Sequence, residues 1–481
     1  MPAARSARRS LTLVGAVLLI TGCAVGPDYE RPDLSLPADW EDPDMLPAEQ
    51  REDWSSWWER YEDPALEALV ERATAENLEI QTQAARVRQA RAQLGLAEAE
   101  QLPRLDLQAE ATRQEQSEVA DTVGGGEPFT QYGIAGVLDY ELDLWGRLDR
   151  GEEAARARLL ESAYAADAVR LSVISDVVTT YFELRAAERQ LQIAQRTAES
   201  RERNLGIQRS RYEAGATTEL TYRQAQAELE SVRAEVPGLR HQVERLENAL
   251  GVLVGQNPRE LMADESLPGT PLDEIRLPAE RPDLLPSELL ERRPDVRAAE
   301  ALMIAANADI GGAKAQWFPS LNLSAMVGTQ ALDAGDLFSP AAGNWSAGAS
   351  LLTPLLDFGR IRANVETAEA VRDQAELQYR TTVRTAFREV RDALTLLETA
   401  NERLQARQRQ VAALQRTLVV AERRYEGGYT SFIEVLDAQR ALLDAELAVS
   451  TAVRDRFAAT ATLYRALGGG WSAPPSAASD A

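Results

Sequence analysis

Hydrophobic residues recur every seven positions along two long stretches of the chain. The first heptad series is Val177, Leu184, Leu191, Ala198, Leu205 and Tyr212. Adding 213 to each number gives a second apolar series, Val390, Leu397, Leu404, Val411, Leu418 and Tyr425. No proline occurs from about 147 to 213 or from about 360 to 426, so each stretch is predicted to be one coiled-coil-like helix. At 1.5 Å per residue, each helix would be roughly 100 Å long.

Each long helix is expected to end in a sharp turn and a returning helix. Gly215 and Gly428 permit such turns, because glycine readily adopts the left-handed conformation that ends many helices. The predicted helical hairpins cover 147–252 and 360–467. Helices of this length cannot bury their own apolar seam and need lateral neighbours. The periodicity alone is also compatible with a solitary antiparallel coiled coil.

A two-residue alternation of apolar and polar positions precedes each long helix. It predicts strands at about 104–116, 129–143, 319–330 and 344–356. The apolar positions are Leu105, Leu107, Ala109 and Ala111; Tyr132, Ile134, Gly136, Leu138, Tyr140 and Leu142; Leu321, Leu323, Ala325 and Val327; and Trp345, Ala347, Ala349, Leu351, Thr353 and Leu355. Strands of this length can cross a bilayer when tilted. An ordinary water-soluble sheet packed on helices would show the same alternation.

The constant offset of 213 residues indicates an internal duplication. The stretch "RYEAGATTELTYRQAQ" (211–226) matches "RYEGGYTSFIEVLDAQ" (424–439), and Gly146-Arg147 matches Gly359-Arg360. The predicted domain organisation is as follows: a signal peptide at 1–22, an extended N-terminal strap at 23–53, repeat 1 at 54–252, a Pro-rich linker at 253–292, repeat 2 at 293–467 and a disordered tail at 468–481. Each repeat is predicted to contain, in this order, a helix, two strands, a long helix, a turn and a returning helix.

The N-terminus has the pattern of a secretory signal. Arginines precede the apolar run "LTLVGAVLLI" (11–20), which is too short to span a bilayer as a helix. The run ends in "LITGC", which resembles a bacterial lipobox and predicts a mature chain that begins at a lipidated Cys23, carrying an N-acyl group and an S-diacylglycerol. Acyl chains would anchor the chain by about 0.8 kcal/mol per buried methylene. Ala24 instead of Asp after the cysteine favours delivery to the outer membrane in such lipoproteins. The alternative is a plain secreted protein that retains one thiol.

Charge and apolar content exclude several classes of protein. The formal net charge is −24 and Lys314 is the only lysine, so nucleic acid is not an expected partner. No segment after residue 22 has the run of about 18 apolar residues that a transmembrane helix needs. If the chain crosses a membrane, it must therefore use strands. Four strands cannot close a barrel and an open edge in lipid is costly, so several chains would have to pool their strands.

The residue types that carry enzymatic or metal chemistry do not cluster in the sequence. His241 is the only histidine and Cys23 the only cysteine, and neither has the converging partners that a general base or a metal site requires. We therefore expect no catalytic residues, no metal and no cofactor other than the lipid on Cys23. The glycines at 124–126 lack the Lys-Ser/Thr ending of a phosphate loop and are expected to form a turn between two strands. The aromatic residues at 54–61 could stack on a ligand, but helix packing is the preferred interpretation.

Three stretches resemble the outer-membrane factor family of TolC-like efflux channels, in particular its NodT-type lipoprotein branch. They are "WWERYEDPALEALVERATAENLEIQTQAARVRQARA" from Trp57, "RRPDVRAAEALMIAANADIGGAKAQWFPSLNLSA" from Arg292 and "RYEGGYTSFIEVLDAQRALLDAE" from Arg424. The resemblance covers nearly all of the mature chain.

The resemblance implies a mainly α protein with a membrane β-barrel. Three chains would contribute four strands each to a 12-stranded barrel that stands on a long periplasmic α-helical barrel. Such a homotrimer passively conducts drugs or other small molecules, delivered by an inner-membrane transporter through a periplasmic adaptor, and it sits in the outer membrane as a lipoprotein. An alternative within the family is the exit duct of a type I protein secretion system. A periplasmic coiled-coil adaptor lipoprotein is a rival from another class, but it would carry a lipoyl-like domain and no 213-residue duplication.

The resemblance also assigns roles to residues near the two turns. Gly215 with Thr217, and Gly428 with Thr430, would mark the hairpin tips that contact the adaptor. Glu434 and Asp437 match an acidic pair that lines the periplasmic aperture and sets its selectivity, and Tyr425 matches a tyrosine of its closing network. From the residues alone, solvated acids on one face of a helix are the favoured interpretation. Well-known members carry an arginine of the closing network where this chain has Thr430; Arg424 or Arg211 could substitute for it.

Overall fold

The chain divides into two compact units. The computed structural model describes residues 24–35, 54–115, 128–263, 267, 269–276 and 286–471. The first unit, which we call the strand unit, combines the N-terminal segment up to residue 33 with residues 86–162 and 298–380; the second, the helical unit, contains the rest. The signal peptide, Cys23, the glycines at 124–126 and most of the C-terminal tail lie outside the described residues.

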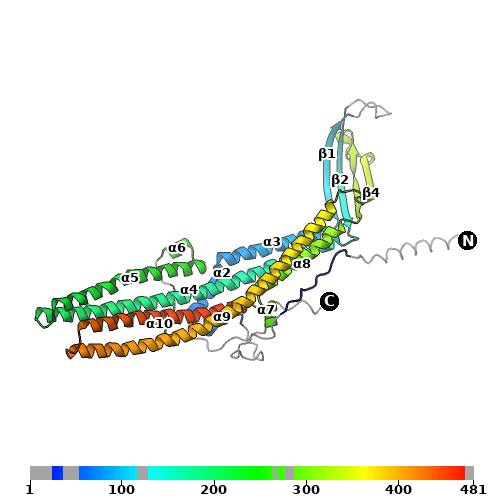
Figure 1. Cartoon of the computed structure of the whole chain (residues 1–481). Helices are drawn as coiled ribbons and strands as arrows, with labels where there is room; N and C mark the ends of the chain where they lie inside the picture. The colour runs from blue at the N-terminus through cyan, green and yellow to red at the C-terminus, as the bar shows by residue number, and fades with distance from the viewer. Residues whose placement is uncertain are drawn as a thin grey trace. The chain divides into compact units, whose positions relative to one another are not determined.

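The strand unit contains one antiparallel sheet with the strand order β1-β2-β3-β4 (Figure 1). Strands β1 (Arg104–Gln114) and β2 (Phe129–Leu142) come from the first repeat, whereas β3 (Ser320–Ala331) and β4 (Gly343–Leu352) come from the second. The two repeats are joined through the β2–β3 pair. Two short 3₁₀ turns, η2 (Ala334–Asp336) and η3 (Pro340–Ala342), connect β3 to β4.

The strand register collects the predicted apolar positions on one face of the sheet. Leu105 pairs with Leu138, Leu138 with Ala325, and Ala325 with Ala347. Because successive side chains point to opposite faces, the other apolar positions within the four strands join the same face. Large side chains on this face are exposed on the outer strands: Leu107 is 80% exposed and Trp345 is 78% exposed. The sheet thus has an apolar face that nothing in the described residues buries.

One predicted strand is too long. Alternation suggested that the fourth strand reaches about residue 356, but β4 ends at Leu352, so Thr353 and Leu355 lie beyond the sheet. Proline has no N–H to donate to a strand ladder, and Pro354 follows closely. The other three strands begin and end within two residues of the positions expected from the sequence.

The N-terminal segment 24–33 packs on helix α8 (Pro294–Ala315) within the strand unit. The Arg31 guanidinium donates to both carboxylate oxygens of Glu300, at 2.6 and 2.9 Å. A Cβ atom on Gly311 would lie 2.7 Å from the carbonyl oxygen of Val25, so only glycine permits this approach. The beginning of the predicted strap is therefore a docked segment of irregular backbone.

The helical unit is built around two helix pairs, one from each repeat (Figure 1). In the first repeat, α4 (Arg147–Glu213) is followed by α5 (Glu219–Leu253); in the second, α9 (Arg360–Glu426) is followed by α10 (Phe432–Ala466). Both long helices, α4 and α9, have 67 residues, and parts of each belong to the strand unit. The other helices of the described residues are η1 (Trp57–Tyr61), α2 (Pro64–Glu76), α3 (Leu78–Glu100), α6 (Pro258–Leu261) and α7 (Pro286–Arg292); most of α3 belongs to the strand unit. Helices α6 and α7 show that parts of the Pro-rich linker are helical.

The same turn ends four helices of the duplicated hairpins. After α4, the N–H of Gly215 donates to Tyr212 and that of Ala216 to Arg211, which is the hydrogen-bond pattern of a Schellman motif. The motif recurs after α5, α9 and α10, centred on glycines with φ between 70° and 79°. These glycines are Gly215, Gly255, Gly428 and Gly468. Because 213 residues separate each matching pair, the duplication preserved both the tip turn and the closing turn of the hairpin.

The aromatic residues near the N-terminus form the core of the helical unit. Trp57 and Tyr61 are fully buried, and the Tyr61 hydroxyl donates to the Phe457 carbonyl at 3.1 Å. Phe182 and Phe457 stack with their ring centroids 4.4 Å apart. Packing is therefore the role of this cluster in the structure.

A buried carboxylate next to this core joins α2 to α4. Asp63 caps helix α2 and accepts hydrogen bonds from the hydroxyls of Tyr181 and Thr270. Burial raises the pKa of Tyr181, and its hydrogen bond to Asp63 raises it further. This polar network stabilises the junction because each buried group has a partner.

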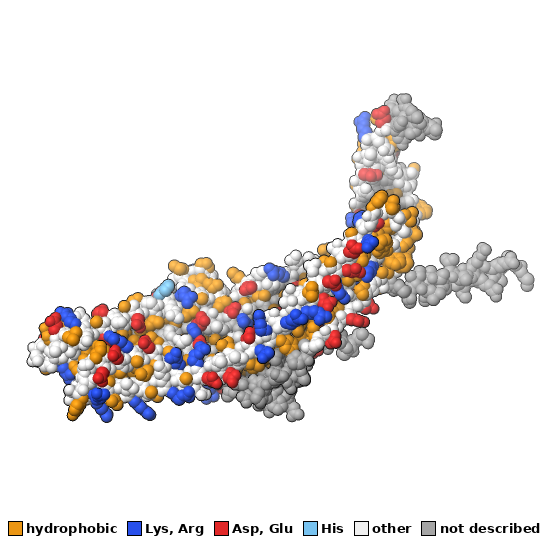
Figure 2. All heavy atoms as spheres, viewed as in Figure 1, with side chains coloured by type: hydrophobic (Ala, Val, Ile, Leu, Met, Phe, Trp, Pro, Cys, Tyr) orange, Lys and Arg blue, Asp and Glu red, His pale blue; other side chains and the backbone are white. Residues whose placement is uncertain are grey.

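Charged side chains cover much of the helical surface. Figure 2 shows arginines and acidic residues interspersed along the helices. No helix in the described ranges combines the length and the apolarity needed to cross a membrane. Within the same ranges, no three His, Cys, Asp or Glu side chains are grouped to hold a metal ion. His241 lies exposed on α5.

The closing turn provides a test of the helical unit. Gly255 has φ +79°, and an added Cβ would lie 2.6 Å from the Glu76 carbonyl oxygen. Gly255→Ala should therefore lower the free energy of unfolding by at least about 1 kcal/mol. Gly238→Ala, inside α5 with no atom within 4 Å of the added Cβ, should raise it by about 0.5–1 kcal/mol. Chemical denaturation followed by circular dichroism measures both; equal effects of the two variants would contradict this account of the turn.

Candidate functional site

The candidate site lies where α9 ends and α10 begins. The N–H of Gly428 donates to Tyr425 at 3.0 Å and that of Tyr429 to Arg424 at 2.9 Å, which closes the turn. In the first repeat, the matching turn at Gly215 leads into α5, whose N-cap Thr218 accepts a hydrogen bond from the N–H of Thr221. Both tip glycines are exposed. The four residues expected at the tips, Gly215, Thr217, Gly428 and Thr430, all lie in these two turns.

Glu434 and Asp437 occupy the exposed face of the first turns of α10. Their side chains are 50% and 67% exposed. The opposite face of the same turns carries Phe432, Val435 and Leu436, all buried in one apolar cluster. Residues three apart on a helix share a face, so the apolar contacts hold α10 in an orientation that presents both carboxylates to solvent.

Each of these two acids has one arginine nearby. The Nη1 of Arg424 is 3.8 Å from Oε2 of Glu434, and the Nη1 of Arg440 is 3.6 Å from Oδ1 of Asp437. Both distances are long and both partners are exposed, so each pair contributes at most about 1 kcal/mol. Of the two candidate replacements for the missing arginine, Arg424 thus approaches the acidic pair. The Arg211 side chain makes no hydrogen bond or ion pair within the described part of the chain.

Tyr425 joins the two repeats near the tips. Its hydroxyl donates to Oε1 of Gln208 on α4 at 3.2 Å, and its ring lies 5.1 Å from that of Phe432. Thr430, at the position of the missing arginine, has a buried hydroxyl without a hydrogen-bond partner among the described residues. The structure thus brings Tyr425, Arg424 and the two acids to one end of the hairpin, while Thr430 makes no polar side-chain contact there.

Next to this site lies an ion triad, centred on a buried glutamate, that no sequence pattern predicted. Glu228 on α5 is 3% exposed. Its carboxylate accepts a hydrogen bond from Nε of Arg440 at 2.7 Å and lies 3.7 Å from Nε of Arg201 on α4. Burial lowers the pKa of Arg201, and the Glu228 charge opposes this effect. No local signal in the sequence distinguishes Glu228 from the many solvated glutamates, because its partners are distant in sequence.

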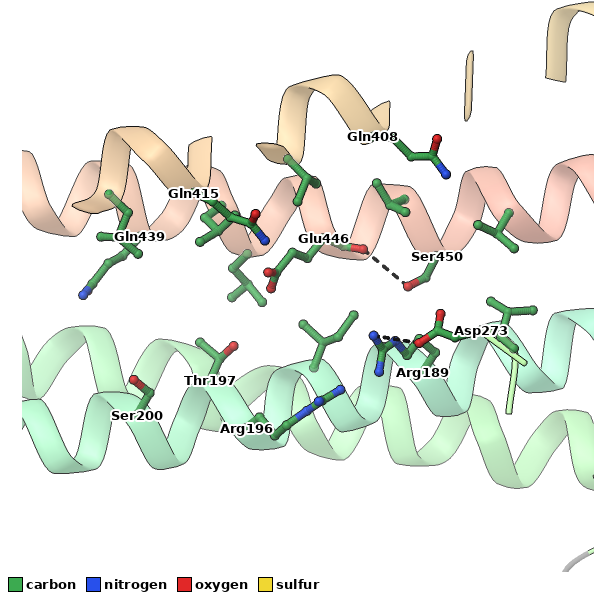
Figure 3. A pocket seen from close by; sticks show the side chains of 18 of the residues that line it. Arg189, Arg196, Thr197, Ser200, Asp273, Gln408, Gln415, Gln439, Glu446 and Ser450 are labelled. Carbon is green, nitrogen blue, oxygen red and sulfur yellow. Dashed lines mark hydrogen bonds and ion pairs between the residues drawn. The ribbon is translucent and has the colours of Figure 1, made fainter. Parts of the chain in front are cut away.

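A groove of about 540 Å³ lies between α4, α9 and α10, further along the helical unit. Arg189, Arg196 and Glu446 line it (Figure 3). The Arg189 guanidinium pairs with Asp273 from the linker at 2.8 Å. Burial raises the pKa of Glu446, although both arginines oppose the shift. The groove is amphipathic, with apolar side chains of α9 and α10 beside these charges.

Comparison with known proteins shows the class of protein to which this chain belongs. The cation efflux system protein CusC of Escherichia coli O6:H1 is 31% identical over 456 residues, which cover 94% of this chain and 97% of that protein. The probable outer membrane lipoprotein SilC of Salmonella typhimurium is 30% identical, over 96% and 98% of the two chains. The crystal structure of the open state of the MtrE outer membrane channel of Neisseria gonorrhoeae superposes with a TM-score of 0.83 at 30% identity, covering 93% and 98%. The fold is therefore that of an outer-membrane channel protein.

The family model for outer membrane efflux proteins matches residues 69–256 and 285–469. These two segments correspond closely to the two repeats, and the chain belongs to the outer membrane efflux protein family. It is an outer-membrane component of an efflux system. The resemblance noted from the sequence is confirmed, and the family consists of channel proteins rather than enzymes.

The groove generates a prediction about pH. Because burial raises the folded-state pKa of Glu446, the folded chain binds this proton more tightly than the unfolded chain does. The ionised carboxylate therefore costs stability at pH 7, and this cost is relieved as the pH falls through the raised pKa. Glu446→Gln should be more stable than the parent at pH 7, with a difference that shrinks towards pH 4.

Denaturation series at several pH values measure this difference. Glu235→Gln, which removes an exposed carboxylate from α5, is the matched control and should change stability little at any pH. A Glu446→Gln variant that is less stable at pH 7 and converges with the parent at high pH would contradict the assignment.

Proposed function

We propose that the chain forms a homotrimer whose three sheets close one 12-stranded barrel, with the helices forming a hollow periplasmic cylinder. The observation that carries this proposal is the sheet itself. Its apolar face is exposed, and its outer strands, β1 and β4, each have one unpaired edge. In a bilayer, unpaired backbone groups at an open edge cost several kcal/mol each. Pairing β4 of one copy with β1 of the next removes every edge and places the apolar face against lipid.

In this assembly, the duct is a passive exit for small molecules or ions. An inner-membrane transporter delivers the substrate, and a periplasmic adaptor joins it to the hairpin tips at Gly215, Thr217, Gly428 and Thr430. The tips offer exposed apolar side chains for such a contact, including Leu220 and Tyr429. CusC is named for cation efflux; we propose that this chain likewise handles cationic cargo, since its aperture residues are acidic.

The N-terminus holds the chain at the membrane. A lipid on Cys23 agrees with the naming of SilC as an outer membrane lipoprotein. The first residue described, Ala24, lies close to Gly146 at the junction between β2 and α4: a Cβ on Gly146 would be 3.0 Å from the Cα of Ala24. The described part of the N-terminal segment therefore begins near the end of the sheet, where the bilayer surface is expected.

The acidic pair forms a ring at the aperture of the trimer. Three copies of Glu434 and Asp437 place six carboxylates around one narrow opening. Such a ring attracts cations and repels anions, because charges lining a constriction focus the electrostatic field. Tyr425 stabilises the closed arrangement through Gln208, and Arg424 rather than an arginine at position 430 contributes the nearby positive charge.

Fractionation and electrophoresis test the assembly. The protein purified from outer membrane should migrate as a trimer in unheated samples and as a monomer after boiling. In planar bilayers it should form pores, and a strain lacking the gene should accumulate more of the pump's substrates. A protein that fractionates with the inner membrane and forms no pore would favour the adaptor alternative.

Neutralising the ring should change ion selectivity. Glu434→Gln combined with Asp437→Asn removes six charges from the proposed opening. The ratio of cation to anion permeability, measured from reversal potentials in a salt gradient, should fall several-fold. Glu230→Gln with Glu219→Gln removes the same number of exposed charges from α5 and serves as the control. Unchanged reversal potentials in the aperture variant would refute the ring.

A further inference from the structure

Arg440 lies between two carboxylates that differ greatly in exposure. Its Nε donates to the buried Glu228 at 2.7 Å, whereas its Nη1 is 3.6 Å from the exposed Asp437. Glu228 belongs to the first repeat and Arg440 to the second. The positions that match them after the 213-residue shift are Ala441 and Ala227. The contact therefore occurs once per chain and joins the two hairpins.

The buried carboxylate holds the arginine more firmly than the exposed one. An ionised group that is removed from water is costly unless it is paired and hydrogen-bonded. Glu228 is 3% exposed, and its other neighbour, Arg201, lies at 3.7 Å, beyond ordinary hydrogen-bond distance. Arg440 thus supplies the hydrogen bond from a charged donor that Glu228 needs. Asp437 is 67% exposed and keeps its hydration without the arginine.

From this geometry we infer that Glu228 is a positioning residue for the selectivity of the channel. It draws the Arg440 guanidinium away from Asp437, so that the charge of Asp437 at the aperture is only partly neutralised. Without Glu228, Arg440 would close on Asp437 and cancel that charge. This inference rests on the proposed aperture role of Asp437.

Reversal potentials of single variants give the first test. Glu228→Gln should lower the ratio of cation to anion permeability by roughly two-fold, because Arg440 then neutralises one aperture charge per subunit. Arg440→Gln should raise the ratio, because Asp437 loses its positive neighbour. Glu230→Gln is the matched control: it removes a carboxylate two residues further along α5 whose side chain is 59% exposed and pairs with Arg233, and it should leave the ratio unchanged.

The double variant separates positioning from a direct effect of charge. If Glu228 acts through Arg440, Glu228→Gln should have no further effect in an Arg440→Gln background. Equal effects of Glu228→Gln with and without Arg440 would show that its own charge matters, and would overturn the inference. If Glu228→Gln fails to assemble, Arg440→Gln alone provides the test, because this variant leaves Glu228 paired with Arg201. An unchanged or lower permeability ratio in assembled Arg440→Gln trimers would also overturn the inference.

Asp437→Asn distinguishes this inference from the proposed function. If Asp437→Asn leaves the reversal potential unchanged, the aperture role of Asp437 fails and the inference fails with it. If Asp437→Asn lowers the permeability ratio, the aperture role stands. The substitution Arg440→Gln must then lose its effect in the Asp437→Asn background; a persistent effect would overturn the positioning role alone.

Discussion

An apolar sheet face with two unpaired edges is the constraint on which the rest of the structure depends. A sheet in this state is stable neither in water, where the apolar face is exposed, nor as a single copy in lipid, where the edges are unsatisfied. The described residues contain nothing that covers Leu107 or Trp345. Strands of neighbouring copies satisfy the unpaired edges, and lipid covers the apolar face. Pairing of strands between copies of the chain meets this requirement, with three copies in the proposed assembly. In each repeat, a long helix follows the second strand of the pair.

The local features of the fold could be predicted because they depend on residues close in sequence. Period-two alternation placed the strands, and heptad spacing with an absence of proline placed α4 and α9. The turn at Gly428 needs only one residue that tolerates positive φ. The prediction for the end of β4 was wrong because it rested on the alternation, which continues to Leu355. The strand ends at Leu352, two residues before Pro354, which has no N–H to donate to a strand ladder.

The non-local features could not be predicted from pattern. Glu228 and Arg440 are separated by 212 positions, and the sequence surrounds each with other charged residues. Only the packing of α5 and α10 shows that one acid is buried and the other exposed. The same holds for Gly311, which reads as an ordinary helix glycine until Val25 is found against it. Burial of a charge is a property of the assembled helices, so periodicity within one helix is a weak guide to it.

Duplication explains why the tip carries both shared and unshared residues. The glycine turns are shared because both hairpins need the same reversal, and φ near +70° restricts the choice of residue. Side chains outside the turn are free to diverge. The first repeat has Thr221 and Gln224 where the second has Glu434 and Asp437. Glu228 of the first repeat pairs with Arg440 of the second, although these two positions do not match in the duplication. In the proposed trimer, the second hairpin thus carries the charge of the opening, and the first hairpin controls how much of that charge is neutralised.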